Sequence, residues 1–513
     1  MNLLLEPWIP VRSLYGGSPK KIALRELLCG DDKWGLCLPR DDMELAALQL
    51  LICIMQTLIT PKTIIELKTR IAKSLPKEEY DLAIQPFSDW FQLDHPKYPF
   101  MQMRGAKVIT PMDKLFAGIT GAENCCFVNE PGLVKELCGG CTAIALFNQA
   151  SCTPGFGGGF KEPLRSGTPI TTLIQGAHLR QTVWLNVLHE DEVKRILPWH
   201  HTTSKQKPTW IAPITTGTKS AESIGIVRGL FWQPAHIELM PPTKKESMCY
   251  LCGQPTSQCY TRFKKDKFSN YKISGTWPHP HSPRILELKR GGEIEHRFPS
   301  FTSIAPAWSQ LNRFVIQQRP EVSIEGYEPA AVVLQSKQIY GQQSQKLHLI
   351  IGGYGRKKAS IVRRCHEVYA FSPGWDEHPL VIKDFVWYGI EYKNALTEAV
   401  SLFCKGKKDK YDSAKNLKGI GEKIRLYKIA EDQYYRRSEP VVLETLACID
   451  FSIPGPFLLN LGHALKEICR ELFNEIVLPY SNDPELIHTM AIARKTLDFN
   501  LKNLEPQKDI RRK

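Results

Sequence analysis

Apolar residues recur at helical spacing near the start of the chain and throughout its last quarter. Residues 43–58 and 63–73 show this pattern, and Asp41 and Asp42 stand where the first helix is expected to begin. After about residue 380 four more segments carry apolar positions three or four apart: residues 385–404, 440–447, 456–474 and 484–503. Four consecutive helices with polar connections predict a C-terminal four-helix bundle.

The part of the chain between these helical segments favours short strands and loops. Residues 223–230, 285–288 and 331–334 are apolar runs of strand length. We therefore predict an α+β protein with two domains. A large mixed N-terminal domain covers residues 1–375, and an all-α four-helix bundle covers residues 380–513.

The clearest β pattern belongs to a hairpin. Residues 347–351 and 360–362 alternate as strands do, and they flank the glycine-rich, basic segment 352–359. This arrangement predicts a hairpin with a long, positively charged tip.

Length and charge narrow the function. A chain of 513 residues is too long for one compact core, which agrees with two or more domains. The net charge of +14 favours nucleic acid or an anionic membrane as partner. An ordinary basic protein is the alternative.

A membrane partner fits the sequence poorly. The longest apolar run, residues 45–58, contains two glutamines and is too short to span a bilayer. The N-terminus also lacks the basic region of a secretory signal. We expect a cytoplasmic protein with reduced thiols and no membrane contact.

Two dithiol pairs are the strongest chemical pattern: Cys138 with Cys141, and Cys249 with Cys252. C-x-x-C spacing lets two thiolates from one turn bind one metal ion, and two turns supply the four sulfurs of a structural zinc. Because 108 positions separate Cys141 from Cys249, a shared metal would join two distant segments. Four thiolates leave no open coordination position, so we expect zinc to stabilise structure. Two unrelated turns with free thiols are the alternative.

Glycine dominates residues 154–161, PGFGGGFK. A backbone without Cβ atoms can approach a ligand closely. The segment lacks the Gly-Lys-Ser/Thr of a phosphate-binding P-loop, and Phe160 stands where a dinucleotide-binding motif has its third glycine. Contact with phosphate, sugar or base edges remains open, and so does a plain surface loop.

Basic residues gather in three places. Residues 262–268, RFKKDKF, interleave cations with aromatic rings, a pattern that suits contact with nucleic acid. Lys289 and Arg290 form a second group. Residues 405–428 contain eight Lys and one Arg and are predicted as a basic loop between helices. For each group, an ordinary solvated surface is the alternative.

Histidines raise the question of a second metal. His279 and His281 alternate with prolines, which favour a stiff extended segment that cannot easily bring both rings to one ion. We expect them to pack or to form hydrogen bonds. His200 and His201 admit a zinc-bearing nuclease as an alternative, but such modules are compact, whereas the cysteine pairs here lie far apart.

These motifs together resemble one family along essentially the whole chain: the large subunit of Cascade, the type I-E CRISPR surveillance complex, or CasA family. The resemblance rests on residues 8–11 (WIPV), 38–47 (LPRDDMELAA), 99–102 (PFMQ), 127–129 (FVN), 137–143 (LCGGCTA), 154–161, 229–236 (GLFWQPAH) and 277–283 (WPHPHSP). It implies an α+β N-terminal domain with a zinc site, and a C-terminal four-helix bundle.

The resemblance implies a role without catalysis. Such a subunit works with other Cascade subunits and a CRISPR guide RNA. It recognises a short tag in target double-stranded DNA, the PAM, and starts the strand opening that leads to an R-loop. It also helps to recruit the helicase-nuclease. A zinc-stapled nuclease and a pure scaffold without DNA contact are the alternatives.

Carried over residue by residue, the resemblance assigns four groups. The zinc ligands are Cys138, Cys141, Cys249 and Cys252, and the loop that docks on the 5′ end of the guide RNA is Phe127, Val128 and Asn129. The PAM minor groove is contacted by Gly155, Gly157, Gly158, Gly159 and Lys267. A basic patch beneath the duplex is Lys289 and Arg290, and the strand-separating wedge is Lys357, Lys358 and Ala359.

The wedge departs from the family pattern. The family has a glutamine at its tip, whereas this chain has Lys358 there. A lysine can contact phosphate, but it lacks the paired donor and acceptor of an amide.

Overall fold

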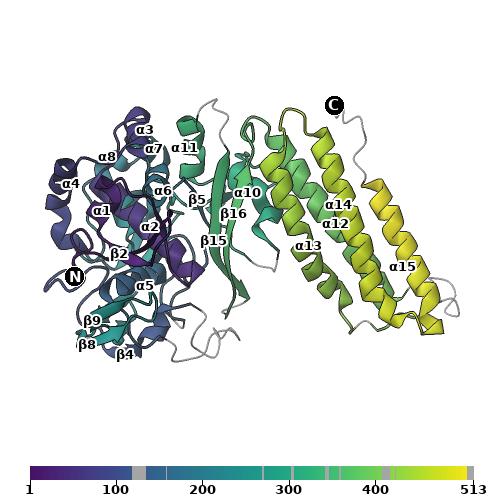
Figure 1. Cartoon of the computed structure of the whole chain (residues 1–513), viewed down its shortest axis with the longest axis horizontal. Helices are drawn as coiled ribbons and strands as arrows, with labels where there is room; N and C mark the ends of the chain where they lie inside the picture. Colours follow the sequence, from purple (N-terminus) through teal and green to yellow (C-terminus); the bar gives the residue numbers. More distant parts are fainter. Residues whose placement is uncertain are drawn as a thin grey trace. The chain divides into compact units, whose positions relative to one another are not determined.

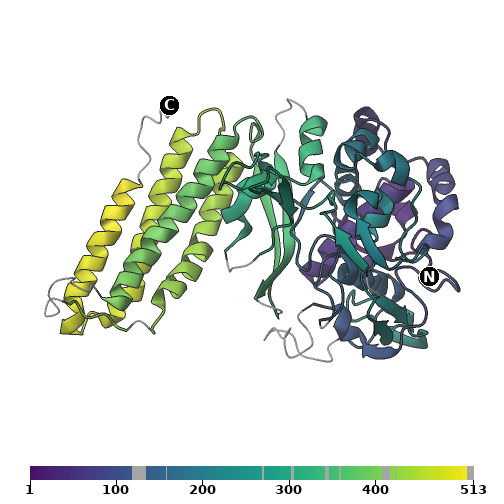
Figure 2. The same ribbon diagram turned by 180° about the vertical axis from the view of Figure 1, so that it is seen from behind.

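The structure is a computed structural model. It describes residues 1–117, 134–157, 159–268, 271–301, 305–340, 346–357, 360–406, 416–421 and 423–504 (Figures 1 and 2). The chain divides into two compact units. The first contains residues 1–303, 317–341 and 348–368, and the second contains residues 304–316, 342–347 and 369–513.

Helix α2, Asp41–Leu58, lies at the centre of the first unit. Sixteen of its eighteen residues are buried, and it packs against α5 (Gly139–Ser151), α6 (Leu179–Leu185) and α9 (Ile226–Leu230). A helix apolar on all sides is stable only when neighbours surround it, which explains the unbroken apolar run in the sequence.

Smaller helices complete the helical part of this unit. They are α1 (Leu24–Cys29), α3 (Ile64–Ala72), α4 (Lys77–Ile84), α7 (Glu190–Ile196), α8 (His200–Thr203), α11 (Ala331–Tyr340), and the 3-10 turns η1 (Gln85–Phe91), η2 (Met112–Leu115) and η3 (Ala221–Ser223). The hydroxyl of Thr63 accepts a hydrogen bond from the Glu66 N–H at 3.2 Å, which caps α3.

Several small sheets share the first unit. Three-stranded sheets have the orders β2-β1-β3 (Lys20–Ile22, Ile9–Ser13, Trp34–Leu36), β4-β10-β7 (Val108–Pro111, Arg262–Asp266, His236–Leu239), β13-β12-β14 (Ile294–Arg297, Arg284–Leu288, Gly326–Glu328) and β16-β15-β5 (Ser360–Phe371, Leu347–Lys357, Thr171–Ile174). Two pairs are β8 with β9 (Thr243–Met248, Pro255–Cys259) and β11 with β6 (Tyr271–Ser274, Gly217–Ser220).

The second unit contains four long helices that lie side by side (Figure 1): α12 (Pro379–Lys405), α13 (Leu426–Cys448), α14 (Gly455–Val477) and α15 (Pro484–Asn503). Helix α12 packs against the other three. The unit also contains η4 (Ala307–Gln310), α10 (Leu311–Val315), η6 (Leu478–Tyr480) and the last residues of β16. A Cβ at Gly389 would lie 2.4 Å from the ring of Trp308, so glycine permits this close contact between α12 and η4.

The predicted mixture of helices and strands is confirmed, but two apolar runs were assigned wrongly. Residues 331–334 begin helix α11, and residues 223–230 fall in η3 and α9. Runs of four to eight apolar residues do not distinguish a strand from a buried helix. In α11 the side chain of Gln335 also binds the Val187 carbonyl at 2.9 Å, a contact that the local sequence does not reveal.

The predicted hairpin is present, but its long tip is wrong. Strand β15 continues to Lys357 and β16 begins at Ser360, so the glycines lie within a strand. A Cβ at Gly352 would lie 2.4 Å from Leu45, and one at Gly353 would lie 2.7 Å from the Pro169 carbonyl. These glycines therefore serve close packing.

Helix boundaries differ at two places. The sequence placed the start of the second C-terminal helix at Pro440, but α13 begins at Leu426 and contains Pro440. Tyr434, before the proline, is buried and donates its hydroxyl to the Gly389 carbonyl at 2.7 Å, so packing extends the helix. Asp41 and Asp42 are the first residues inside α2, and Arg40 occupies the cap position.

Candidate metal centre and nucleic-acid interface

The two C-x-x-C pairs meet. One sulfur from each of Cys138, Cys141, Cys249 and Cys252 lies within 4.8 Å of the other three, and three of the four residues are buried. The prediction that these distant segments share one centre is confirmed.

The first pair lies at the start of α5. Cys138 occupies the cap position and Cys141 the first turn. A Cβ at Gly139 would lie 2.5 Å from the Met1 sulfur, and one at Gly140 would lie 2.8 Å from the Trp8 carbonyl. The two glycines let the helix start pack tightly on the N-terminal residues.

The second pair lies in the turn between β8 and β9. The Gly253 N–H donates to the Cys249 carbonyl at 2.9 Å, and Gly253 has φ +65°, which glycine adopts without strain. The Cys138 N–H donates to the Cys249 sulfur at 3.3 Å. Paired backbone hydrogen bonds between Leu137 and Tyr260, 2.8 and 3.1 Å long, hold the two segments together.

Lys21 on β2 is a neighbour that the sequence did not reveal. Burial acts to lower the pKa of Lys21, but the negative charge of Cys138 and Cys252 outweighs it, and the pKa is raised. An ammonium here offsets part of the charge of four thiolates, as second-shell groups do at metal sites.

The cluster fits a tetrahedral metal. Zinc–sulfur bonds of about 2.3 Å in a tetrahedron place the sulfurs roughly 3.8 Å apart. The sulfurs of Cys138 and Cys252 are 3.9 Å apart. Four thiols converging in a buried place, with a cation beside them, suit a closed zinc site.

The glycine loop, residues 155–159, follows the end of α5. Gly157 and Gly159 have φ +87° and +89°, a region that favours glycine. A Cβ at Gly155 would lie 2.7 Å from the Lys161 carbonyl, whereas nothing described lies within 4 Å of one at Gly157. Gly155 therefore permits the loop to close, and Gly157 faces open space.

Lys267 lies directly beside this loop. A Cβ at Gly159 would come 2.9 Å from the Lys267 ammonium nitrogen. Lys267 is exposed, and no described carboxylate forms an ion pair with it. The structure thus brings together two elements that are more than 100 positions apart in the sequence.

The turn end of the β15–β16 hairpin adjoins the same loop. Arg356, one residue before the end of β15, forms an ion pair of 3.3 Å with Glu162, three residues after the loop. Tyr354 and Ile361 pack against Cys152, and the Tyr354 hydroxyl is 2.9 Å from the Asn148 amide nitrogen.

Some predicted residues lie outside the described part of the chain. They are Phe127, Val128, Asn129, Gly158, Lys358 and Ala359. Lys357 is the last residue of β15, and its side chain is likewise outside the description.

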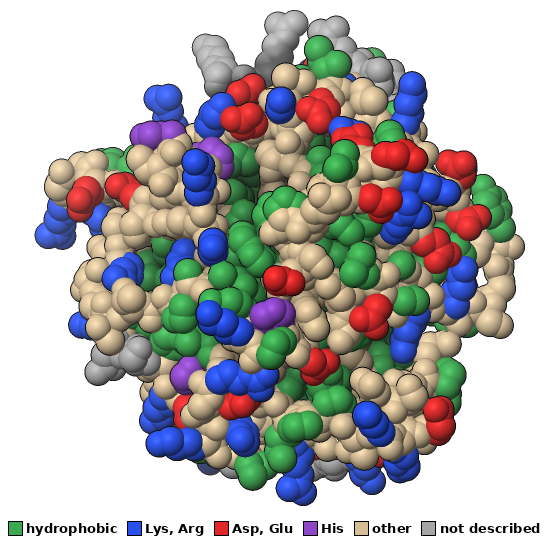
Figure 3. Space-filling model, turned by 90° about the vertical axis from the view of Figure 1, so that its left-hand side faces the viewer, with side chains coloured by type: hydrophobic (Ala, Val, Ile, Leu, Met, Phe, Trp, Pro, Cys, Tyr) green, Lys and Arg blue, Asp and Glu red, His purple; other side chains and the backbone are tan. Residues whose placement is uncertain are grey.

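Lys289 and Arg290 lie in the β12–β13 turn, residues 289–293. Lys289 forms ion pairs with Glu287 at 2.8 Å and Glu295 at 2.7 Å, which raise its pKa. Among the described residues, no hydrogen bond or ion pair joins this turn to the glycine loop. On the face of the first unit drawn in Figure 3, Lys and Arg side chains are interspersed with Asp and Glu.

The histidine prediction is confirmed. His279 and His281 are buried with ring centroids 5.1 Å apart, and the His281 ring nitrogen lies 3.1 Å from the Gln49 amide nitrogen. Burial and the nearby Arg165 lower the pKa of His281 to about 3. Both rings are packed parts of the core.

Arg165 is a second residue that sequence inspection missed. It is 1% exposed and donates to the Ser151 carbonyl at 2.8 Å and the Gln49 side-chain oxygen at 2.7 Å. Because Ser151 ends α5, Arg165 fixes the point from which the glycine loop departs. No sequence pattern distinguishes this arginine from an exposed one.

Across the described ranges, the four cysteines are the one group of three or more His, Cys, Asp or Glu side chains able to hold a metal ion. In the same ranges, no helix is both long and apolar enough to cross a membrane.

The fold and site define a class: a basic, two-unit α+β protein with a four-cysteine cluster at the start of α5 and a glycine loop after the end of α5, beside a lysine that has no described carboxylate partner. Residues 2–475 match the family model of CRISPR-associated protein Cse1 (CRISPR_cse1). The chain belongs to this family, and the predicted resemblance to the large subunit of type I-E Cascade, the CasA family, is confirmed.

Solved structures share the fold. Cse1 from Thermobifida fusca has a TM-score of 0.74 at 16% identity, covering 99% of this chain and 98% of its own. Cse1 from Acidimicrobium ferrooxidans has a TM-score of 0.71 at 16% identity, covering 99% of both. A chain from a CRISPR RNA-guided surveillance complex has a TM-score of 0.63 at 14% identity, covering 97% of this chain and 99% of its own.

Proposed function

We propose that this chain is the non-catalytic large subunit of a CRISPR RNA-guided DNA surveillance complex, recognising the PAM in target duplex and promoting strand opening. The observation that carries the proposal is that Lys267 and the turn end of the β15–β16 hairpin both lie beside the glycine loop. Membership of the Cse1 family supports it, as does the likeness to a chain of a surveillance complex.

The chemistry of this place suits the minor groove. A glycine-rich loop can enter a groove about 6 Å wide, and one lysine can meet the acceptors on its floor. The minor groove separates A·T from G·C but little more, so such a reader tolerates several related PAM sequences.

The hairpin acts after recognition in this proposal. Lys357, Lys358 and Ala359 enter beneath the PAM as a wedge, and the loss of DNA pairing is nearly balanced by pairing with the guide RNA. A small bias from the protein is then enough to start an R-loop. Lys289 and Arg290 contact the duplex backbone.

The four cysteines hold one structural zinc ion in this proposal. Bound zinc adds fixed crosslinks between the start of α5 and the β8–β9 turn, and its closed thiolate shell leaves no position for substrate. Lys21 offsets part of the charge.

Partner contacts complete the proposal. Phe127, Val128 and Asn129 dock on the 5′ end of the guide RNA, and the four C-terminal helices form a bundle that contacts other Cascade subunits. The assembled complex recruits the helicase-nuclease. Its place of action is the cytoplasm.

The experiment measures binding of PAM-bearing and scrambled duplexes by the full chain, assembled with its partner subunits and guide RNA. We expect Lys267→Ala to weaken PAM-bearing binding about tenfold and scrambled binding much less. Equal loss on both duplexes contradicts the groove assignment.

Two other results would reassign the function. Metal-dependent DNA cleavage by the chain, surviving removal of contaminating nucleases, indicates the nuclease. Absence of any salt-dependent DNA binding indicates the scaffold.

A further inference from the structure

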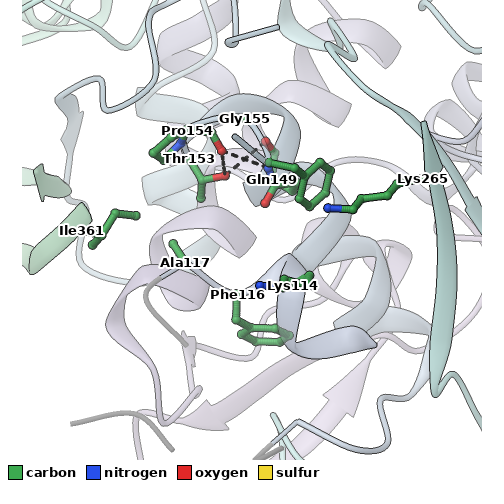
Figure 4. A pocket seen from close by; sticks show the side chains of 10 residues that line it. Lys114, Phe116, Ala117, Gln149, Thr153, Pro154, Gly155, Lys265 and Ile361 are labelled. Atoms are coloured by element: carbon green, nitrogen blue, oxygen red, sulfur yellow. Dashed lines mark hydrogen bonds between the residues drawn. The ribbon is translucent and has the colours of Figure 1, made fainter. Parts of the chain in front are cut away.

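A small pocket opens at the base of the glycine loop (Figure 4). Pro154, Gly155 and Phe156 form one side, and the opposite sides come from η2, β10 and β16. Of its ten lining residues, Lys114 and Lys265 are cations and none is acidic. A pocket of this composition favours an anion.

The neutral polar groups of the pocket already have partners. The Gln149 amide donates to the Pro154 carbonyl at 3.1 Å, and the Thr153 hydroxyl lies 3.3 Å from the carbonyls of Gln149 and Pro154 (dashed in Figure 4). These bonds fix the start of the loop. They leave the two ammonium groups as the donors available to a ligand.

Lys265 is held in place by aromatic rings. Its ammonium nitrogen lies 4.3 Å from the centroid of Phe156 and 5.1 Å from that of Phe160. The ring of Phe156 in turn packs against Phe263, two positions before Lys265 on the same face of β10. The loop and the strand thus orient this lysine toward the pocket.

Neither lysine has a counter-ion among the described residues. Burial, and then the charge of Lys114, lower the pKa of Lys265. Two cations that share a partly desolvated place repel each other, and an anion between them relieves that repulsion.

The pocket has the size of one phosphate group. Its volume is about 70 Å³. One water needs about 10–15 Å³ of cavity volume, so the pocket admits a group several times larger than a water. A phosphate group is of that order of size.

We propose that this pocket binds one backbone phosphate of the duplex DNA, through Lys114 and Lys265. The inference rests on the proposed function, because it places the duplex over the glycine loop. Phosphates border the minor groove, and Lys265 lies two positions from Lys267, which is beside Gly159. The contact fixes the register of the duplex and carries no sequence information.

The test replaces single phosphates of a PAM-bearing duplex by neutral methylphosphonates, one position at a time. Binding is measured with the full chain assembled with partner subunits and guide RNA. For the unmodified protein we expect one position at which neutralisation weakens binding about fivefold to tenfold. Lys265→Met should weaken binding to the unmodified duplex similarly and abolish the sensitivity at that position.

Three variants control the result. Lys265→Arg should restore the sensitivity because it keeps the charge. Lys264→Met removes a charge from the opposite face of β10 and should leave the sensitivity in place. Lys114→Met, in η2, should have the same effects on DNA binding as Lys265→Met. Because the two substitutions lie in separate elements, agreement between them excludes a local folding defect of β10 as the cause.

Several outcomes overturn the inference. It is wrong if neither lysine variant changes the sensitivity at any position of the duplex. If neither lysine variant changes the sensitivity but Lys267→Ala still weakens binding of PAM-bearing duplex more than binding of scrambled duplex, this inference fails alone. If no neutral linkage matters and Lys267→Ala has no effect, the proposed function fails with it.

Discussion

Lysines lie both beside the glycine loop and in the β12–β13 turn, but the lysines of the two regions differ in their ion pairs. Lys267 lies beside Gly159 without a described carboxylate partner, and Lys265 lies over two aromatic rings. Lys289 in the turn is held by Glu287 and Glu295. A count of basic residues in the sequence treats the two places as equal, but the lysines beside the glycine loop have no described carboxylate partner, whereas Lys289 has two.

The difference determines how much affinity an anion can gain at each of the two sites. When an unpaired lysine contacts a DNA phosphate, counter-ions condensed on the DNA are released into solution, which favours binding. An anion that contacts Lys289 must compete with two carboxylates. The loop is therefore the stronger candidate for DNA contact, and in the turn Arg290 is the cation without a described carboxylate partner.

The largest expected effect comes from Gly157→Asp. The position has φ +87° and open space around its Cβ, so we expect the fold to survive with a strain of about 1 kcal/mol. A carboxylate would then face the phosphates of a bound duplex. We expect roughly 100-fold weaker binding, equal to about 2.7 kcal/mol, in a filter-binding or fluorescence assay.

Gly292→Asp is its matched control in the turn. Gly292 has φ +82° and nothing described within 4 Å of a Cβ, so backbone strain and added charge are the same. We expect less than a threefold loss. Similar losses for both variants would contradict the difference between the two regions.

The second largest effect is expected from removal of the metal ion, which stabilises the region of the glycine loop but not the β12–β13 turn. Strand β9 leads from the second cysteine pair through Tyr260 to β10, which carries Lys265. Cys249→Ser should remove bound zinc, disturb β10 and lower the melting temperature by roughly 2–4 °C, if about 2 kcal/mol is lost. Elemental analysis and thermal melting measure this, and DNA binding should fall as well.

Cys448→Ser serves as the control, because Cys448 is an exposed free thiol at the end of α13 in the second unit. It should keep the zinc content and the melting temperature. Purified protein that contains no zinc before any substitution would contradict the metal assignment.

The sequence predicted the four-cysteine cluster because each C-x-x-C spacing is a local pattern. Each C-x-x-C pair is a turn of four residues, and four thiols have few uses in a reducing compartment apart from metal binding. The cap of α3 at Thr63 was predictable for the same reason. The family resemblance further predicted that the glycine loop and Lys267 act together.

The remainder depends on contacts between distant residues. Glu295 reaches Lys289 only because β12 and β13 pair with Glu287 opposite Glu295, a register that no local pattern gives. Gly352 permits close contact with Leu45, some 300 positions away. The local sequence does not reveal this contact, so the glycine was assigned to a hairpin tip although it lies within β15. Lys21 and Arg165 acquire their neighbours in the same way.

Single substitutions of basic residues should give a smaller difference in DNA affinity between the two regions. Lys267→Ala should weaken binding to PAM-bearing duplex about tenfold, whereas Lys289→Ala should change binding to any duplex by less than twofold because its charge is already paired.

Arg290→Ala should weaken binding to PAM-bearing and scrambled duplexes alike. It should lower the slope of log affinity against log salt by roughly 0.9 if it contacts one phosphate. A large, PAM-dependent effect of Lys289→Ala would show that the ion pairs open on binding.

The smallest expected effect tests whether the ion pairs of Lys289 alone explain the weak DNA contact expected at the β12–β13 turn. Glu295→Gln removes one of the two carboxylates that hold Lys289 and frees part of its charge. Glu293→Gln changes the net charge equally in the same turn, yet no described cation forms an ion pair with Glu293. We expect Glu295→Gln to strengthen binding of scrambled duplex about twofold and to steepen its salt dependence, and Glu293→Gln to do so less. Binding isotherms from about 50 to 200 mM salt resolve such a difference. If both variants act alike, net charge and not pairing governs this region, and the contrast with the glycine loop rests on position alone.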